Sequence, residues 1–172
     1  MARVEKSIDV HVPVETAYNQ WTQFEEFPKF MEGVRSVKQL GDRRLQWEAN
    51  VGGRDKVWQA EIKEQVPDQR IIWRSVEGDE NAGVVKFEPL RDGIGSRVSL
   101  QMSYDPDGFL ENAGDALGFM SRRVQGDLER FRDFIESRGM ETGAYRETLA
   151  NPAAPDGFTR GAPAQTGAAR ED

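Results

Sequence analysis

The side chains that most often perform nucleophilic or metal chemistry are nearly missing from this sequence. Its 172 residues include no cysteine, and His11 is its one histidine. Disulfides, thiol nucleophiles, thiolate metal sites and multi-histidine zinc sites are therefore excluded, as is a serine–histidine relay supported by a second histidine. His11 lies on the polar face of a predicted strand, so it could act as a general base only if a pocket reached it.

The other polar side chains are weaker candidates. Tyr104 shares a predicted strand face with apolar residues, so its hydroxyl could orient a ligand inside the molecule. Asp107 lies between this strand and a predicted helix, where we expect it to cap the helix. The acidic run at residues 77–80 lacks the spacing of a calcium-binding loop, and Arg122-Arg123 is expected to be a solvated basic spot. The sequence therefore predicts no catalytic residue, no metal site and no cofactor.

Three of the four tryptophans form a more distinctive pattern. Trp47, Trp58 and Trp73 fall on three consecutive predicted strands, and their alternation places them on the face that points into the molecule. Several rings would then project into the space between a sheet and a helix. Because aromatic rings dominate core burial in any small domain, they are either ordinary core or the wall of a cavity that packs against a ligand.

The spacing of apolar side chains predicts the elements that position these residues. A half-buried strand includes Ile8 and Val10, and Pro13 ends it. Helical spacing over Val14–Trp21 follows, and a second short helix is expected around Phe24–Met31. Later strands are expected over residues 45–51, 58–63, 70–76, 83–90 and 97–104, and the short turns between them make neighbouring strands antiparallel.

A long amphipathic helix is predicted over about Phe109–Arg138. Its apolar residues recur three or four positions apart, and charged side chains occupy much of its remaining surface. Such a helix needs an apolar surface to cover, and one face of the antiparallel sheet supplies it. The predicted fold class is therefore α+β.

Three segments point to a known family: VHVPVETAYNQWTQFEEFPKFM (Val10–Met31), VPDQRIIWRS (Val66–Ser75) and LERFRDFIE (Leu128–Glu136). With them, residues 3–138 resemble the START-like helix-grip (SRPBCC) superfamily, in particular its bacterial polyketide cyclase/dehydrase and coenzyme Q-binding START branch. The resemblance implies a curved antiparallel sheet of about six to seven strands wrapped around the long C-terminal helix. It also implies two short helices after the first strand and an elongated apolar cavity between sheet and helix.

The resemblance further implies binding or carriage of a small hydrophobic molecule, such as a lipid, polyketide or isoprenoid-like compound. One alternative is a cofactor-free polyketide cyclase, aromatase or dehydrase, which needs an ionisable group inside the cavity. The sequence shows no clear one, which favours binding over catalysis. Another alternative is a protein-interaction module for stress or growth regulation. The residues expected to line the cavity are Trp47, Trp58, Trp73, Phe87, Leu100, Met102, Tyr104, Leu117, Met120 and Val124.

Composition divides the chain into a domain, residues 1–138, and a tail, residues 139–172. Glycine, alanine and proline make up 16 of the 34 tail residues, so we expect a disordered tail, with local ordering through Tyr145 or Phe158 as the alternative. The net charge of −7 argues against a nucleic-acid partner. The sequence shows neither an apolar run of roughly 20 residues nor a signal-peptide pattern, so we expect a cytoplasmic protein without stable membrane insertion.

Overall fold

The computed structural model describes residues 1–110 and 115–151 of the chain. Within those ranges a strand is followed by two short helices, six further strands, another short helix and one long helix. The elements are β1 (Ala2–Val10), α1 (Val14–Trp21), the 3-10 helix η1 (Phe24–Lys29), β2 (Val34–Gln39), β3 (Arg44–Val51), β4 (Arg54–Val66), β5 (Arg70–Glu77), β6 (Asn81–Pro89), β7 (Ser96–Tyr104), α2 (Pro106–Leu110) and α3 (Ala116–Arg138).

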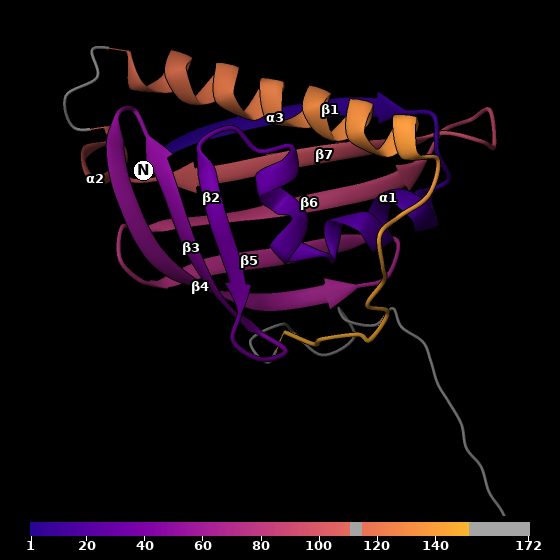
Figure 1. Cartoon of the computed structure of the whole chain (residues 1–172), viewed down its shortest axis with the longest axis horizontal. Helices are drawn as coiled ribbons and strands as arrows, with labels where there is room; N and C mark the ends of the chain where they lie inside the picture. Colours follow the sequence, from indigo (N-terminus) through magenta and orange to yellow (C-terminus); the bar gives the residue numbers. More distant parts are fainter. Residues whose placement is uncertain (111–114, 152–172) are drawn as a thin grey trace, which may run out of the picture.

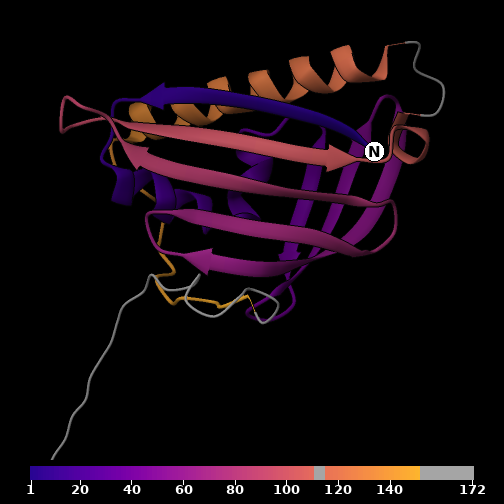
Figure 2. The ribbon, with the colours of Figure 1, turned by 180° about the vertical axis from the view of Figure 1, so that it is seen from behind.

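The strands of the described chain form one antiparallel sheet in the order β1-β7-β6-β5-β4-β3-β2. The sheet is curled, and α3 runs along β1 on its concave side (Figure 1). Seen from behind, the strands lie in front of α1, η1 and α3, so these helices share one side of the sheet (Figure 2). This arrangement confirms the predicted α+β class and the helix-grip fold.

The sequence does not predict strand β2 as a separate element. Within Val34–Gln39 only Val34 and Val37 are apolar, and a register shift between Val34 and Ser36 interrupts the alternation. This strand forms the sheet edge, where it pairs with β3 and packs against η1. Pairing with β3 and packing against η1 therefore stabilise β2. Sequence periodicity does not show such contacts.

Aromatic side chains of α1 and the η1 region fill one end of the space between sheet and α3. The Trp21 ring lies 4.9 Å from the Phe131 ring of α3, and Tyr18 lies 5.4 Å from Phe87 of β6, both edge to face. Phe30 also contacts Phe131, at 5.3 Å between ring centroids. All five side chains are buried, so this end of the concavity is solid core.

Helix α3 begins later than the sequence predicts. Residues Pro106–Leu110 form the separate helix α2, and part of the expected helix, residues 111–114, lies outside the described chain. From Met120 onward the predicted apolar stripe is confirmed, because the buried side chains of α3 are Met120, Val124, Leu128, Phe131 and Ile135. No helix within the described residues is long and apolar enough to cross a bilayer.

The later start of α3 changes which aspartate caps it. Asp115 is the cap, because its Oδ1 accepts a hydrogen bond from the Gly118 N–H at 2.9 Å. The prediction that Asp107 caps the long helix is therefore wrong. The Asp107 N–H instead donates to Asp105 Oδ1 at the start of α2.

Residues 140–150, here called the C-terminal strap, run back over the domain after α3 ends. The strap first binds helix α1 through a buried glutamine, Gln20. The Thr142 N–H donates to Gln20 Oε1 at 2.8 Å, and Gln20 Nε2 donates to Thr142 Oγ1 at 3.0 Å. The Tyr145 N–H then donates to Thr22 Oγ1 at 3.1 Å. The contacts with Thr142 satisfy the Gln20 amide, which α1 would otherwise leave buried and unpaired.

The strap ends against the sheet. Leu149 and Gln65 of β4 exchange two backbone hydrogen bonds of 2.8 Å, and Arg43 donates to the Ala150 carbonyl. The described chain therefore stays in contact with the domain beyond the expected boundary at 138. The disorder expected for the last part of the tail, including Phe158, concerns residues outside the described chain.

These contacts lead to a prediction about truncation. A chain ending at Gly139 should lose about 2–4 kcal/mol of unfolding free energy relative to one ending at Asn151, because several hydrogen bonds disappear and Gln20 loses its partners. Urea denaturation of the two chains measures the difference. The chain ending at Asn151 is the control and should match the full-length protein; equal stability of all three would show that the strap contributes nothing.

Candidate functional site

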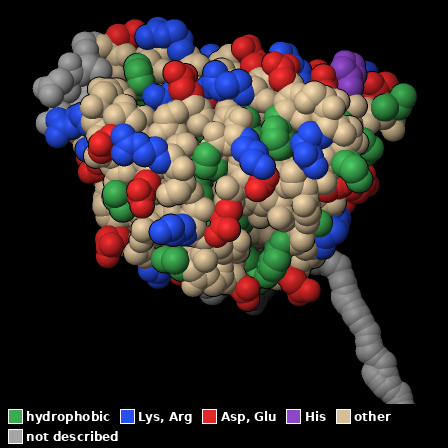
Figure 3. Space-filling model, viewed as in Figure 1, with side chains coloured by type: hydrophobic (Ala, Val, Ile, Leu, Met, Phe, Trp, Pro, Cys, Tyr) green, Lys and Arg blue, Asp and Glu red, His purple; other side chains and the backbone are tan. Residues whose placement is uncertain are grey.

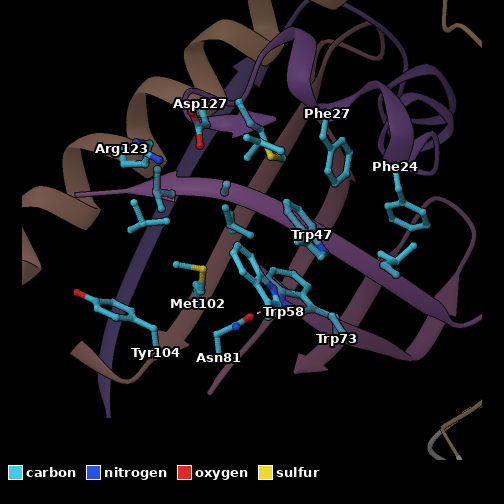
Figure 4. Close-up of a pocket in the computed structure, with 18 of the residues that line it drawn as sticks. Phe24, Phe27, Trp47, Trp58, Trp73, Asn81, Met102, Tyr104, Arg123 and Asp127 are labelled. Carbon is cyan, nitrogen blue, oxygen red and sulfur yellow. Dashed lines mark hydrogen bonds between the residues drawn. The ribbon is translucent and has the colours of Figure 1, made fainter. Parts of the chain in front are cut away.

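A cavity of about 140 Å³ lies between the concave face of the sheet and the middle of α3. Its wall is almost entirely apolar and includes side chains from α1, η1, strands β2 to β7 and α3 (Figure 4). It also borders Glu32, whose side chain is 65 % exposed. This end of the cavity therefore lies close to the surface, between the segment that follows η1 and helix α3, and we call it the mouth.

The structure places eight of the ten predicted lining residues around this one cavity. They come from β3, β4, β5, β7 and α3, although β3 and β7 are not neighbours in the sheet. The eight are Trp47, Trp58, Trp73, Leu100, Met102, Tyr104, Met120 and Val124.

The other two predicted lining residues lie elsewhere. Phe87 packs between Tyr18 and Trp21, at 5.4 and 6.2 Å between ring centroids, in the solid aromatic core beside the cavity. Leu117 lies in the first turn of α3 and is 51 % exposed. Because α3 begins at Ala116, its apolar stripe first meets the sheet at Met120, one turn after the expected position.

A pair of stacked indoles forms the middle of the cavity wall. Trp47 of β3 and Trp58 of β4 are directly opposite each other in the strand register, so their side chains share one face. Their rings are nearly parallel, with an interplanar angle of 8° and 5.5 Å between centroids. Trp47 also contacts Phe27 of η1 at 5.6 Å. The stack gives this wall a broad, flat aromatic surface.

The third indole is oriented by a buried amide. Trp73 Nε1 donates to Asn81 Oδ1 at 3.4 Å, and Asn81 Nδ2 donates to the Asp79 carbonyl at 3.1 Å. The Trp73 ring lies across Gly83 of the neighbouring strand, where a β-carbon would come within 2.5 Å of the indole. Glycine at this position therefore allows the indole to lie against the sheet.

Tyr104 forms the end of the cavity near the start of α3. Its side chain is buried, and its hydroxyl donates to the Ala116 carbonyl at 3.3 Å. Desolvation by burial raises the pKa of Tyr104, and Asp115 raises it further. The residue therefore supplies a neutral hydroxyl that already has one partner on α3.

Oppositely charged side chains surround the mouth. Arg123 Nη1 donates to the Glu32 carbonyl at 2.8 Å, and its guanidinium also approaches the Asn50 carbonyl. The backbone can come this close because Gly33, at φ +81°, has no β-carbon; one would lie 2.5 Å from the Asn50 oxygen. Figure 3 shows basic and acidic side chains interspersed over this face of the molecule.

Asp127 is a partly buried charged lining residue that the sequence analysis missed. Its Oδ1 accepts hydrogen bonds from the Glu32 N–H, at 2.9 Å, and from Arg130. Burial raises the pKa of the Asp127 carboxyl, and these two donors offset the effect only in part. A signal was present, because Asp127 follows Met120 by seven positions and so falls on the apolar stripe of α3. Arg123, interpreted from the sequence as solvated, also lines the cavity.

Comparison with known proteins identifies the family. A family model described as polyketide cyclase/dehydrase and lipid transport matches residues 10–132. The chain belongs to this family. An uncharacterized 17.2 kDa protein from the melC2–rnhH intergenic region of Streptomyces lincolnensis is 53 % identical over 147 residues, which are 85 % of this chain and 97 % of that protein.

Solved structures share the fold of this polyketide cyclase/dehydrase family member. The protein DR_A0006 from Deinococcus radiodurans is 27 % identical, with a TM-score of 0.65 over 81 % of this chain and all of the other. A START superfamily protein from Mycobacterium smegmatis has a TM-score of 0.62 over 79 % of this chain and 95 % of the other, at 14 % identity. The second likeness shows the shared fold alone.

The environment of Asp127 in this family member leads to a prediction about titration. Its carboxyl should titrate above the ordinary aspartate value of about 3.9, and Arg130→Ala should raise the pKa further by removing a hydrogen bond and a positive charge. Because the pKa of Asp127 is higher in the folded protein than in the unfolded chain, its contribution to the unfolding free energy falls as the pH rises from the unfolded pKa through the folded pKa.

Carbon-13 NMR of the side-chain carboxyls measures these pKa values. Asp9 is the internal control, since its hydrogen bond with Arg97 lowers its pKa. A midpoint for Asp127 at or below that of Asp9 would contradict the prediction.

Proposed function

We propose that this protein binds a compact, ring-bearing apolar molecule in the cavity between the sheet and α3. The observation that supports this most directly is the apolar wall with the parallel Trp47–Trp58 pair. Flat aromatic surfaces favour stacking and edge contacts with other rings, and pockets for small molecules are typically apolar with a few placed polar groups. The family, which includes lipid transport in its description, is consistent with such a role.

The size of the cavity limits the ligand. Its volume of about 140 Å³ is close to that of an engineered cavity of roughly 150 Å³ in another protein that binds benzene. A single substituted ring, or one end of a longer chain, matches this space. A whole multi-ring polyketide or a long isoprenoid tail would need the walls to move apart.

Asp127 favours a second candidate function, catalysis of proton transfer in a cyclase or dehydrase. Its carboxylate borders the cavity, and a base there could take a proton from the carbon beside a ligand carbonyl, leaving an enolate and a neutral Asp127. Return of the proton restores both groups. Acetophenone dissolved in D2O tests this: the protein should accelerate exchange of the methyl protons, and Asp127→Asn should abolish the acceleration. Equal exchange with and without protein would remove this candidate.

The binding proposal predicts different behaviour for two residues of α3. Met120 lines the cavity, whereas Phe131 packs against Trp21 and Phe30. Met120→Ala should change the affinity for para-xylene several-fold. It should cost less unfolding free energy than Phe131→Ala, because a side chain facing open space has fewer contacts to lose. Phe131→Ala should cost about 3–5 kcal/mol and leave the affinity of the folded fraction unchanged.

Calorimetric titration and urea denaturation of the two variants and the native protein measure these effects. Native mass spectrometry of protein purified without detergent adds a direct search for a retained molecule. Absence of saturable para-xylene binding to the folded protein would contradict the proposed function. Equal stability losses with unchanged affinity in both variants would show that Met120 is ordinary core.

A further inference from the structure

We propose that the natural ligand has a neutral hydroxyl group on its ring or at the end of its chain, and that Asp127 at the mouth accepts a hydrogen bond from it. This inference rests on the proposed function, because it assigns a chemical class to the molecule that occupies the same cavity. Figure 4 shows Asp127 and Arg123 side by side on α3, across the cavity from the tryptophans.

The two oxygens of Asp127 have different surroundings. Oδ1 is occupied by the Glu32 N–H and by Arg130. Oδ2 accepts no hydrogen bond from any residue in the described ranges 1–110 and 115–151. Oδ2 is not one of the fully buried side-chain atoms that lack a partner, so it is accessible to a donor. A hydroxyl on a molecule in the cavity can provide that donor.

Two other polar groups of the wall already have partners within the protein. Asn81 accepts from Trp73 and donates to the Asp79 carbonyl, and the Tyr104 hydroxyl donates to the Ala116 carbonyl. They therefore orient parts of the wall and have less to gain from a ligand. The buried Trp47 Nε1 has no partner among the described residues, but it is a donor. Asp127 differs from all three groups as an acceptor whose second oxygen is available.

The charges at the mouth favour a neutral donor over an ion. Glu32 and Asp127 are balanced by Arg123 and Arg130, whose nitrogens lie 3.9 and 3.6 Å from Glu32 Oε1. Because the two carboxylates and the two guanidiniums cancel, neither a cationic nor an anionic ligand gains net electrostatic attraction at the mouth. A hydroxyl adds a hydrogen-bond donor without changing the balance of charge at the mouth. A hydrogen bond to a charged group is also stronger than one between two neutral groups.

The test compares two ligands of nearly equal shape, para-cresol and para-xylene, which differ by a hydroxyl in place of a methyl group. In a cavity without an acceptor, para-xylene should bind more tightly, because removing the hydroxyl from water is costly. With Asp127 as acceptor, the full-length protein should bind para-cresol at least as tightly as para-xylene in calorimetric titrations.

Asp127→Asn should shift the ratio of the two dissociation constants by roughly tenfold or more towards para-xylene. This variant can keep the two contacts of Oδ1 and turns the free acceptor into a donor. Asp133→Asn, at an exposed position on the same helix, is the matched control and should leave the ratio unchanged. Urea denaturation verifies that both variants fold. If Asp127→Asn does not fold, the ratio of the two dissociation constants in the native protein still tests the proposal.

The outcomes separate this inference from the proposed function. Preference for para-cresol that depends on Asp127 supports both. Strong preference of the native protein for para-xylene overturns the hydroxyl inference and leaves the binding function intact. An equal shift in Asp133→Asn also overturns it, because the effect would then not belong to the mouth. Binding of neither compound overturns the proposed function, and the hydroxyl inference with it.

Discussion

The contact between α3 and the curled sheet determines where the molecule is solid and where it is hollow. A helix is about 10–12 Å wide, whereas seven strands spaced about 4.8 Å apart span about 29 Å, so α3 can cover only part of the concave face. It packs along β1, and Tyr18, Trp21 and the phenylalanines around η1 fill one end of the remaining space. The cavity occupies what is left between α3 and the inner face of the strands, chiefly β3, β4, β5 and β7.

The mouth combines support of the fold with recognition chemistry. Asp127 and Arg123 lie on α3, while Glu32 and Gly33 lie on the segment before β2, and their hydrogen bonds join the helix to the edge of the sheet. Arg130 adds a hydrogen bond to the Phe30 carbonyl. Each charge there is compensated by a neighbour or a backbone dipole, which reduces the cost of placing ions beside an apolar space. The same groups therefore hold the opening in shape and give it polarity.

The sequence predicts those parts of the structure that repeat regularly along the chain. Alternation reveals β3 and the indoles of Trp47 and Trp58, and helical spacing reveals α3 from Met120 onward. Features that depend on contacts between distant parts of the chain are not predicted from the sequence. Strand β2 has little alternation of its own, and the strap has a loop-like composition yet is fixed by hydrogen bonds to Gln20 and Gln65. The spacing of Asp127 predicts an inward position. What the spacing does not show is that the carboxylate accepts a hydrogen bond from the Glu32 N–H, 95 residues away along the chain.

The order of strands in the sheet has a consequence for synthesis on the ribosome. Strand β1 is made first, yet within the sheet it pairs only with β7, with Ala2 opposite Tyr104. At roughly 5–20 residues per second, β1 waits on the order of 5–20 s before that partner exists. Its outward side chains include Arg3, Glu5 and Asp9, and charges of this kind discourage an unpaired strand from joining another chain. A polar outward face therefore lowers the tendency of β1 to pair with another chain before β7 is made.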